Sequence, residues 1–212
     1  MPGRGILYNG PMVRHDWNLT PRQAVALQHE LRSQVVQSPL DRPVRLVAGV
    51  DCAFVGSFRT AGKVLTAAVS LDARTLEVVA HATAVGDCTF PYVPGLLSFR
   101  EAPAVIEAVQ KLPRRPDLLL CDGQGLAHPR GLGLASHVGL WLDLPAIGAA
   151  KSRLCGEHRP VGPRRGNRSR LMLSGKGVGV ALRTQDHVRP MYISVVHRIT
   201  LEKAIRWTLR LA

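Results

Sequence analysis

The sequence predicts a single α/β domain in which helices flank a mixed central sheet, and three observations lead to this prediction. The β-rich segments come first and follow one another closely, as in an antiparallel meander, whereas the later ones alternate with helical segments. No internal repeat or change of composition divides the 212 residues. With 46% hydrophobic and 20% charged residues, the chain can bury a substantial core and does not resemble a disordered protein.

The first predicted elements are a helix and three strands. Thr20, Pro21 and Gln23 form a helix-start signal, and the apolar residues that follow at helical spacing extend the predicted helix over 21–36. Three runs rich in β-branched and apolar residues come next, and a short turn joins the last two. These runs predict strands over 44–55, 63–71 and 75–84.

The later elements alternate between helix and strand. A proline-containing loop precedes a predicted helix over 98–111, and a strand over 117–121 ends at Asp122 and a Gly-Gln-Gly turn. The remaining predictions are a helix over 132–142, a strand over 145–149, a hairpin made of 177–183 and 190–196, and a terminal helix that begins after Thr200. This order is typical of a ribonuclease H-like sheet, in which the first and fourth strands are neighbours.

Two acidic residues interrupt or end apolar strands that this topology places side by side. Asp51 lies within the apolar run 46–55, and Asp122 follows the run 118–121. A water-facing carboxylate and an ordinary Asp-Gly turn are the alternative explanations. Adjacent carboxylates repel each other unless a cation neutralises them, and oxygen ligands favour Mg²⁺ or Mn²⁺. The pair therefore predicts a divalent-metal site.

Several other polar residues allow both a structural and a functional interpretation. Glu101 follows Ser98 by three residues, so it fits a helix capping box as well as a metal site. Lys151 ends a strand, where it is either an ordinary exposed lysine or a group that stabilises charge on a phosphate. His128 and His197 are each more often packed or surface residues than participants in chemistry.

Tyr92 lies in the proline-stiffened loop 90–95. It is either an aromatic residue folded onto the core or a wedge that holds a base out of a duplex.

The charge of the chain favours a polyanionic partner. Twenty-eight Lys and Arg residues, 23 of them Arg, oppose 15 Asp and Glu residues and give a net charge of +13. Genome composition and solubility are the alternative explanation. Seven basic residues lie between Lys151 and Arg170 against the single acid Glu157, interspersed with Gly and Pro. This segment predicts a basic loop that contacts nucleic-acid phosphates.

The cysteines and the hydropathy pattern exclude several classes of protein. Cys52, Cys88, Cys121 and Cys155 lie too far apart for zinc-ligand spacing, which indicates reduced thiols in a cytoplasmic protein. No apolar run approaches 18 residues, and the first 20 residues have no apolar signal region. We therefore expect neither a membrane span nor a secretory signal.

Five segments, in the right order, resemble the signature blocks of the endonuclease V family of deoxyinosine-directed nucleases. They are VAGVDCAF (47–54), PYVPGLLSFRE (91–101), CDGQGLAHPRGLGLASHVGL (121–140), PAIGAAKSRL (145–154) and ISVVHRITLE (193–202). The resemblance covers about 17–212, which we expect to form one catalytic domain. It leaves 1–16 as an amino-terminal extension whose order the sequence does not decide. Cys52, Phe54 and the pair Val195-Val196 depart from the family pattern, and the last departure bears on the role of His197.

The resemblance implies a ribonuclease H-like DNA repair endonuclease that recognises deoxyinosine. Such an enzyme hydrolyses the second phosphodiester bond on the 3′ side of the lesion and leaves 3′-hydroxyl and 5′-phosphate ends. It implies Mg²⁺ as the cofactor, with Mn²⁺ as a substitute. It also implies that Asp51, Glu101 and Asp122 bind the metal, and that Lys151 and His197 act in catalysis.

The resemblance further implies where DNA would be held. The strand-separating wedge would consist of Tyr92 with its neighbours Pro91, Val93 and Pro94. The pocket for the flipped base would be lined by Gly95, Leu97, His128, Gly133 and Leu154. The basic loop would contact the nucleic-acid backbone through Ser152, Arg153, Arg164, Arg165 and Arg168.

Three other functions remain open at this point. An endoribonuclease directed at inosine in RNA would use the same residues. A catalytically inactive nucleic-acid-binding module would keep the basic surface, although it has no need for three acids beside a phosphate. A structural domain with an Arg-rich surface is the third. The sequence indicates no protein partner, and we expect a monomer.

Overall fold

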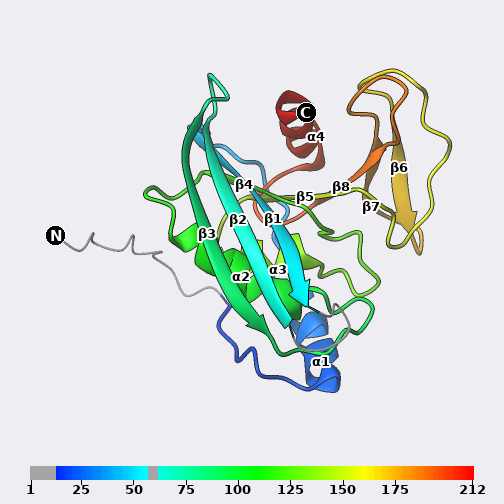
Figure 1. Ribbon diagram of the computed structural model, residues 1–212. Helices are drawn as coiled ribbons and strands as arrows, with labels where there is room; N and C mark the ends of the chain where they lie inside the picture. Colours follow the sequence, from blue (N-terminus) through cyan, green and yellow to red (C-terminus); the bar gives the residue numbers. More distant parts are fainter. Residues whose placement is uncertain (1–12, 57–61) are drawn as a thin grey trace.

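The computed structural model describes residues 13–56 and 62–212, and these form one mixed sheet with helices on both faces (Figure 1). The sheet has eight strands in the order β3-β2-β1-β4-β5-β8-β7-β6. In chain order the elements are α1 (Pro21–Arg32), β1 (Leu46–Gly56), β2 (Gly62–Asp72), β3 (Val78–Cys88), α2 (Ser98–Gln110), β4 (Leu118–Cys121), α3 (Leu134–Leu142), β5 (Ala146–Ala150), β6 (Arg168–Leu173), β7 (Lys176–Leu182), β8 (Met191–Val195) and α4 (Leu201–Leu211).

The strand directions confirm the predicted mixed sheet. Strands β1, β2 and β3 form an antiparallel meander, and β4 and β5 then add parallel to β1. The carboxyl ends of β1, β4 and β5 therefore point to the same edge of the sheet. Strand β8 is antiparallel to β5, so it runs away from that edge.

The two faces of the sheet have separate apolar cores. Helices α2 and α3 pack together against Ala48 and Val50 of β1, and they lie behind β1–β3 in Figure 1. Helix α4 packs on the opposite face, against Val47 and Ile147, near the start of β1. Alternate side chains of β1 thus enter different cores, as the period of two along a strand requires.

Three predicted boundaries are wrong. The predicted helix 21–36 ends at Arg32, although Val35 still packs into the apolar cluster from an irregular segment and so extends the helical spacing beyond the helix. The predicted strand 75–84 begins only at Val78, because Asp72 accepts hydrogen bonds from the backbone N–H groups of Arg74 and Thr75 and holds them in a turn. The predicted basic loop 151–170 extends into β6, whose six residues pair with β7.

The folded domain begins before Trp17. Residues 1–12 of the expected extension 1–16 lie outside the described residues, but the last part of it packs against α3. Nε2 of His15 is hydrogen-bonded to Nε2 of His137 at 2.7 Å, and the guanidinium of Arg14 lies 4.9 Å from the ring centre of Trp141. In the described part of the chain, no helix has the length and apolarity needed to cross a bilayer.

Candidate active site

Asp51 and Asp122 lie next to each other because their strands are parallel neighbours. Val50 of β1 is in register with Cys121 of β4, so each aspartate comes one residue after a paired position. The backbone N–H of Asp122 donates to the carbonyl of Val50 at 3.2 Å, which continues the ladder by one bond. Asp51 is exposed, and its Oδ1 accepts from the N–H of Cys52 at 2.8 Å. The predicted approach of the two acids is therefore present in the structure.

Glu101 approaches the same edge from the first turn of α2. Its side chain is buried, and this burial, followed by the charges of Asp122 and Asp51, raises the pKa of its carboxyl group to about 8. The capping-box explanation fails, because no side chain caps α2 at its first residue. The hydroxyl of Ser98 is instead hydrogen-bonded to Nδ1 of His137 at 3.1 Å. Glu101 thus completes a group of three neighbouring carboxyl groups.

Lys151 follows the last residue of β5 and extends over the acids. Its Nζ donates to Oδ2 of Asp122 at 2.6 Å, and this bond raises the pKa of the lysine. The Lys151 side chain is 75% exposed, so the ion pair is accessible to a ligand. Asp51, Asp122 and Lys151 border a hollow of about 390 Å³ on the sheet surface, whose floor consists of apolar side chains such as Leu120 and Met191.

The chemistry of these side chains suits a hard divalent cation. All three candidate ligands are oxygen donors, and the pKa of Glu101 is raised first by burial and then by the charges of Asp122 and Asp51, a repulsion that a cation would relieve. As they are placed, however, no three acidic, His or Cys side chains of the described residues are gathered tightly enough to coordinate one ion. The ammonium group of Lys151 is bonded to Asp122 and places a positive charge 2.6 Å from its Oδ2. A cation would therefore compete with Lys151 for Asp122.

A cavity of about 200 Å³ lies beside this group of charges. The segments that carry the charged groups also form its wall: Leu97 and Ser98 precede Glu101, Gly123 and Gln124 follow Asp122, and Leu154 follows Lys151. All five residues expected to line the base pocket border this cavity, namely Gly95, Leu97, His128, Gly133 and Leu154. Sequence analysis missed six further residues that border it: Gln28, Ser98, Gly123, Gln124, Leu132 and Leu134.

Three side chains that donate to the carbonyl group of Gly95 hold one wall of this cavity in place. The carbonyl oxygen of Gly95 accepts from Nε2 of Gln28 at 3.0 Å, Nε2 of His128 at 2.9 Å and Nη2 of Arg130 at 2.7 Å. Gly95 has φ +79°, and a Cβ atom at this position would lie 2.6 Å from Nη2 of Arg130. Only glycine fits without displacing the arginine. Gln28 belongs to the buried face of α1 with Ala24 and Leu31, and a lone polar residue in such an apolar face was a detectable signal.

His128 is uncharged in this arrangement. Its Nδ1 accepts from the backbone N–H of Arg130 at 3.1 Å, so its proton lies on Nε2 and is donated to Gly95. Burial lowers the pKa of His128 to about 4. The ring therefore provides a neutral, fixed wall for the cavity.

The expected wedge residues lie at the mouth of the cavity. Tyr92 is 43% exposed, with Pro91 and Pro94 also exposed on either side, whereas Val93 packs towards the cluster around Phe90. Tyr92, Val93 and Pro94 all border the cavity. The aromatic ring of Tyr92 is therefore exposed at the edge of this cavity.

The structure does not place His197 with the acids, as its expected catalytic role would require. Strand β8 is antiparallel to β5, so its end lies beside the start of β5, where the N–H of Ala146 donates to the carbonyl of His197. Lys151 lies five residues further along the chain, about 16 Å away at a strand rise of about 3.3 Å per residue.

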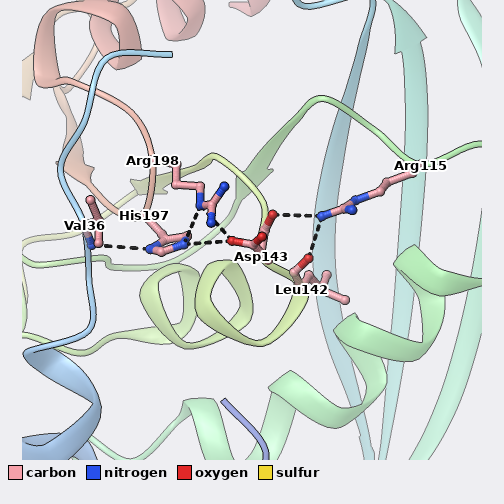
Figure 2. Close-up of polar contacts among 6 residues, drawn as sticks. All are labelled: Val36, Arg115, Leu142, Asp143, His197 and Arg198. Atoms are coloured by element: carbon pink, nitrogen blue, oxygen red, sulfur yellow. Dashed lines mark hydrogen bonds and ion pairs between the residues drawn. The ribbon is translucent and has the colours of Figure 1, made fainter. Parts of the chain in front are cut away.

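Instead, His197 is the buried member of a polar cluster at the end of α3 (Figure 2). Its Nδ1 accepts from the N–H of Val36 at 3.4 Å, and its Nε2 lies 3.2 Å from Oδ1 of Asp143 and 3.1 Å from Nε of Arg198. Burial lowers the pKa of the ring. Arg198 also binds Asp143, at 2.7 Å, while Arg115 donates to the carbonyl groups of Leu142 and Asp143. The cluster joins the end of α3 to the segments before β1 and α4.

Some of the residues expected to contact phosphates are exposed without such a contact being needed by the fold, whereas Arg165 and Arg168 bond to other parts of the domain. Ser152, Arg153 and Arg164 are exposed. Arg165 donates from its guanidinium to the carbonyl of Thr184 at 3.0 Å and to that of Leu209, and Arg168 forms an ion pair with Glu202 at 3.2 Å. Arg165 therefore ties the loop to the domain.

Comparison with known proteins assigns the family. The family model of endonuclease V matches residues 29–212. An endonuclease V of Rhodospirillum centenum is 48% identical over 204 residues, which cover 95% of this chain and 85% of the relative. The chain belongs to the endonuclease V family. Four of its five signature-like segments border the site, and the fifth, 193–202, contains His197 at the other end of β5.

Solved structures of endonuclease V share the fold. The Streptomyces avermitilis protein is 45% identical with a TM-score of 0.83, and the match covers 94% of this chain and 86% of that one. A Ciona intestinalis endonuclease V is 23% identical with a TM-score of 0.74, over 89% of this chain and 87% of that one. It was crystallised with a 24mer DNA that contains an inosine followed by a ribo-adenosine.

Proposed function

We propose that the protein is a metal-dependent DNA repair endonuclease that recognises deoxyinosine. It hydrolyses the second phosphodiester bond on the 3′ side of the lesion and leaves 3′-hydroxyl and 5′-phosphate ends. The observation that supports this function best is that three neighbouring carboxyl groups and Lys151 lie on the same segments that form the wall of a cavity. The inosine-containing DNA bound to the Ciona relative agrees with this substrate.

The acids would hold a divalent cation, with Mg²⁺ or Mn²⁺ the best match to oxygen donors. Asp51 and Asp122 are the primary ligands and Glu101 the third, held directly or through water. Such a cation, when bound, polarises the attacking water and stabilises the leaving oxygen. Lys151 lies beside Asp122 and stabilises the negative charge that develops on the phosphate.

The cavity would take the extruded base. Inosine pairs weakly, so flipping it out of the duplex costs less than flipping a normal base. Tyr92 then occupies the space next to the flipped base, while the rigid wall of Gly95 and His128 sets the shape that the base must match. Exposed basic residues such as Arg153 and Arg164 contact the backbone without regard to sequence.

Cleavage of defined duplexes tests the proposal. Purified protein is incubated with end-labelled duplexes that contain one deoxyinosine or none, with Mg²⁺ or EDTA, and the product is mapped on a sequencing gel. We expect a metal-dependent nick one bond beyond the lesion. Asp51→Ala and Asp122→Ala should abolish cleavage but retain lesion binding in Ca²⁺. An intact inosine strand, or cleavage that persists in EDTA, would refute this function.

RNA that contains inosine is the second candidate substrate. The ribo-adenosine after the inosine in the Ciona complex is the observation that favours it. The same assay with matched RNA, DNA and DNA carrying one ribonucleotide 3′ to the lesion ranks the substrates. Cleavage of RNA alone would make the protein an endoribonuclease.

A further inference from the structure

Another hollow, of about 320 Å³, lies between α4 and the segment that precedes β1. Four cationic side chains border it, one from that segment and three from α4: Arg42, Lys203, Arg206 and Arg210. The α4 residues are three or four positions apart and so share one face of the helix. Trp207 lies on the same face and packs partly against the core, where it forms an apolar part of the wall.

The positive charge around this hollow is largely unbalanced. Among the described residues, one carboxylate forms an ion pair with the four cations, namely Oδ1 of Asp41, which lies 3.9 Å from Nζ of Lys203. Arg42 and Arg206 are exposed, and neither side chain bonds to any other residue in the part of the chain that the structure describes. Arg206 and Arg210 are one helical turn apart, a spacing at which like charges repel. An anionic ligand would relieve this repulsion.

The hollow lies beside the start of β1, away from the acids. Nη2 of Arg210 donates to the carbonyl of Arg74 at 3.1 Å, in the turn between β2 and β3. This turn lies next to the start of β1, because Asp72 at the end of β2 is in register with Leu46. Asp51 follows Leu46 by five residues. The hollow is therefore separated from Asp51 by about 16 Å along the direction of β1.

The hollow and Asp51 nevertheless share one face of the sheet. Val47 packs into the core beneath α4, and Gly49 and Asp51 follow at steps of two, so all three point to the same face of β1. Between α4 and the acids, this face is formed by Gly49 and by Ala67 and Val69 of β2. Ala67 is exposed, and the other two are half-buried. A long ligand that is held at Asp51 can therefore extend over the sheet to α4 (Figure 1).

We infer that Arg42, Arg206 and Arg210 bind the backbone phosphates of duplex DNA that flanks the lesion. This inference rests on the proposed function, in which Asp51 marks the cleaved bond. From residue 203 to 210 the helix rises about 10 Å, a length over which one strand of DNA carries about three phosphates. The separation of about 16 Å corresponds to about five base pairs. DNA is the favoured polyanion because the acids and Lys151 bind it on the same face.

The test compares two double variants that each remove two positive charges. Arg42→Gln/Arg206→Gln removes the two unpaired arginines, whose exposure predicts an unchanged Tm. Lys111→Gln/Arg114→Gln is the matched control, because both residues are exposed at the end of α2, which covers the opposite face of the sheet. If the Tm of the first variant falls, Arg206→Gln alone replaces it.

Binding is measured by fluorescence titration in Ca²⁺, with salt concentration varied. One duplex carries a deoxyinosine with long flanks on both sides, and two others have one flank or the other cut to about four base pairs, which ends short of the hollow. An unmodified long duplex completes the set. Cutting the flank that reaches α4 should weaken binding by wild type, while the other flank reports contacts made elsewhere.

We expect Arg42→Gln/Arg206→Gln to bind the long duplex about 10- to 100-fold more weakly than wild type near 0.1 M salt. The slope of the log binding constant against log salt concentration should fall by about 2, or by about 1 for Arg206→Gln alone. On one of the two shortened duplexes, variant and wild type should bind within about threefold of each other, because the contacted phosphates are absent. The control variant should keep the wild-type affinity and slope.

Two results would overturn the inference. One is a variant that binds the long duplex with the wild-type affinity and slope, and the other is a loss of equal size on all three deoxyinosine duplexes. Failure of the proposed function is recognised separately, when wild type does not prefer the deoxyinosine duplex to the unmodified one. In that case the unmodified duplex decides: a slope lowered by about 2 supports the contact with DNA, and an unchanged slope overturns it.

Discussion

Replacing His197 with alanine should destabilise the fold and leave the cleavage step almost unchanged. The imidazole is 1% exposed and bonds to Asp143 and to the backbone N–H of Val36 at one end of β5, whereas the acids and Lys151 lie at the other end. The histidine is therefore a structural link between α3 and the segment before α4 (Figure 2).

The magnitude follows from what the substitution removes. Truncating a buried ring to alanine leaves a cavity, which costs about 2 to 3 kcal/mol, and each lost hydrogen bond adds about 0.5 to 1.5 kcal/mol. The two hydrogen bonds and the cavity together should thus lower the free energy of unfolding by about 3 to 6 kcal/mol. For a protein of this length, 1 kcal/mol lowers Tm by about 2 to 4 °C, so a fall of about 6 to 24 °C is expected.

Thermal unfolding and single-turnover cleavage on the same preparations provide the assay. The cleavage rate is measured at a temperature where the variant is fully folded, and it should stay within about threefold of wild type. Asp143→Ala should lower Tm in the same way, since it breaks the same contact. Lys151→Ala is the opposite control: its side chain is exposed, so Tm should change little while cleavage is lost. A His197→Ala protein with the wild-type Tm and a 100-fold slower reaction would refute this argument.

Three further predictions concern the wedge, the basic loop and the buried histidines. Tyr92→Ala should slow cleavage of inosine in duplex DNA about tenfold more than in single strands, because only a duplex requires a group to replace the flipped base; equal losses in a gel assay would exclude a wedge. In fluorescence titrations, Arg164→Ala should reduce the slope of the log binding constant against log salt concentration by about 1. Arg165→Ala removes the bonds to Thr184 and Leu209, so it should lower Tm and leave that slope unchanged. The pKa values of His128 and His137 are lowered to about 4 and about 3 by burial, so both rings stay neutral in the folded protein at pH 5. Because they protonate near pH 6.5 only on unfolding, each should reduce stability by about 2 kcal/mol at pH 5, and NMR titration showing either ring protonated near pH 6.5 in the folded state would contradict this.

The approach of the acids and Lys151 could be predicted from the sequence because parallel strands place their carboxyl ends at the same edge of the sheet. Asp51, Asp122 and Lys151 each lie in or follow an apolar strand, and β1, β4 and β5 all run towards the same edge. The same rule fails for His197. It also follows an apolar strand, but β8 is antiparallel, and strand direction is set by pairing partners distant in the sequence rather than by the local residues.

The features that the sequence did not reveal depend on long-range contacts. Strand β6 begins with Arg168, Ser169 and Arg170 at the end of an Arg-rich segment, so its first half favours a loop, and its pairing with β7 makes it a strand. The bonds of Arg165 to Thr184 and Leu209 connect residues 19 and 44 positions apart. Gln124 lies in a Gly-Gln-Gly turn that has an adequate local explanation, and only the folded chain brings its side chain to the cavity and to the carbonyl of Ser152.

The cavity and the acids are carried by the same two segments, and this affects where the proposed enzyme would cut. Helix α2 supplies both Ser98 at the cavity and Glu101 at the acids, and the turn after β4 supplies both Asp122 and Gln124. Both segments are held by the sheet, so the separation between a bound base and the acids is set by the fold rather than by a mobile loop. A flipped base held in the cavity would then lie at a fixed distance from Asp51 and Lys151. Cleavage at a fixed distance from the lesion is the expected result of this rigid arrangement.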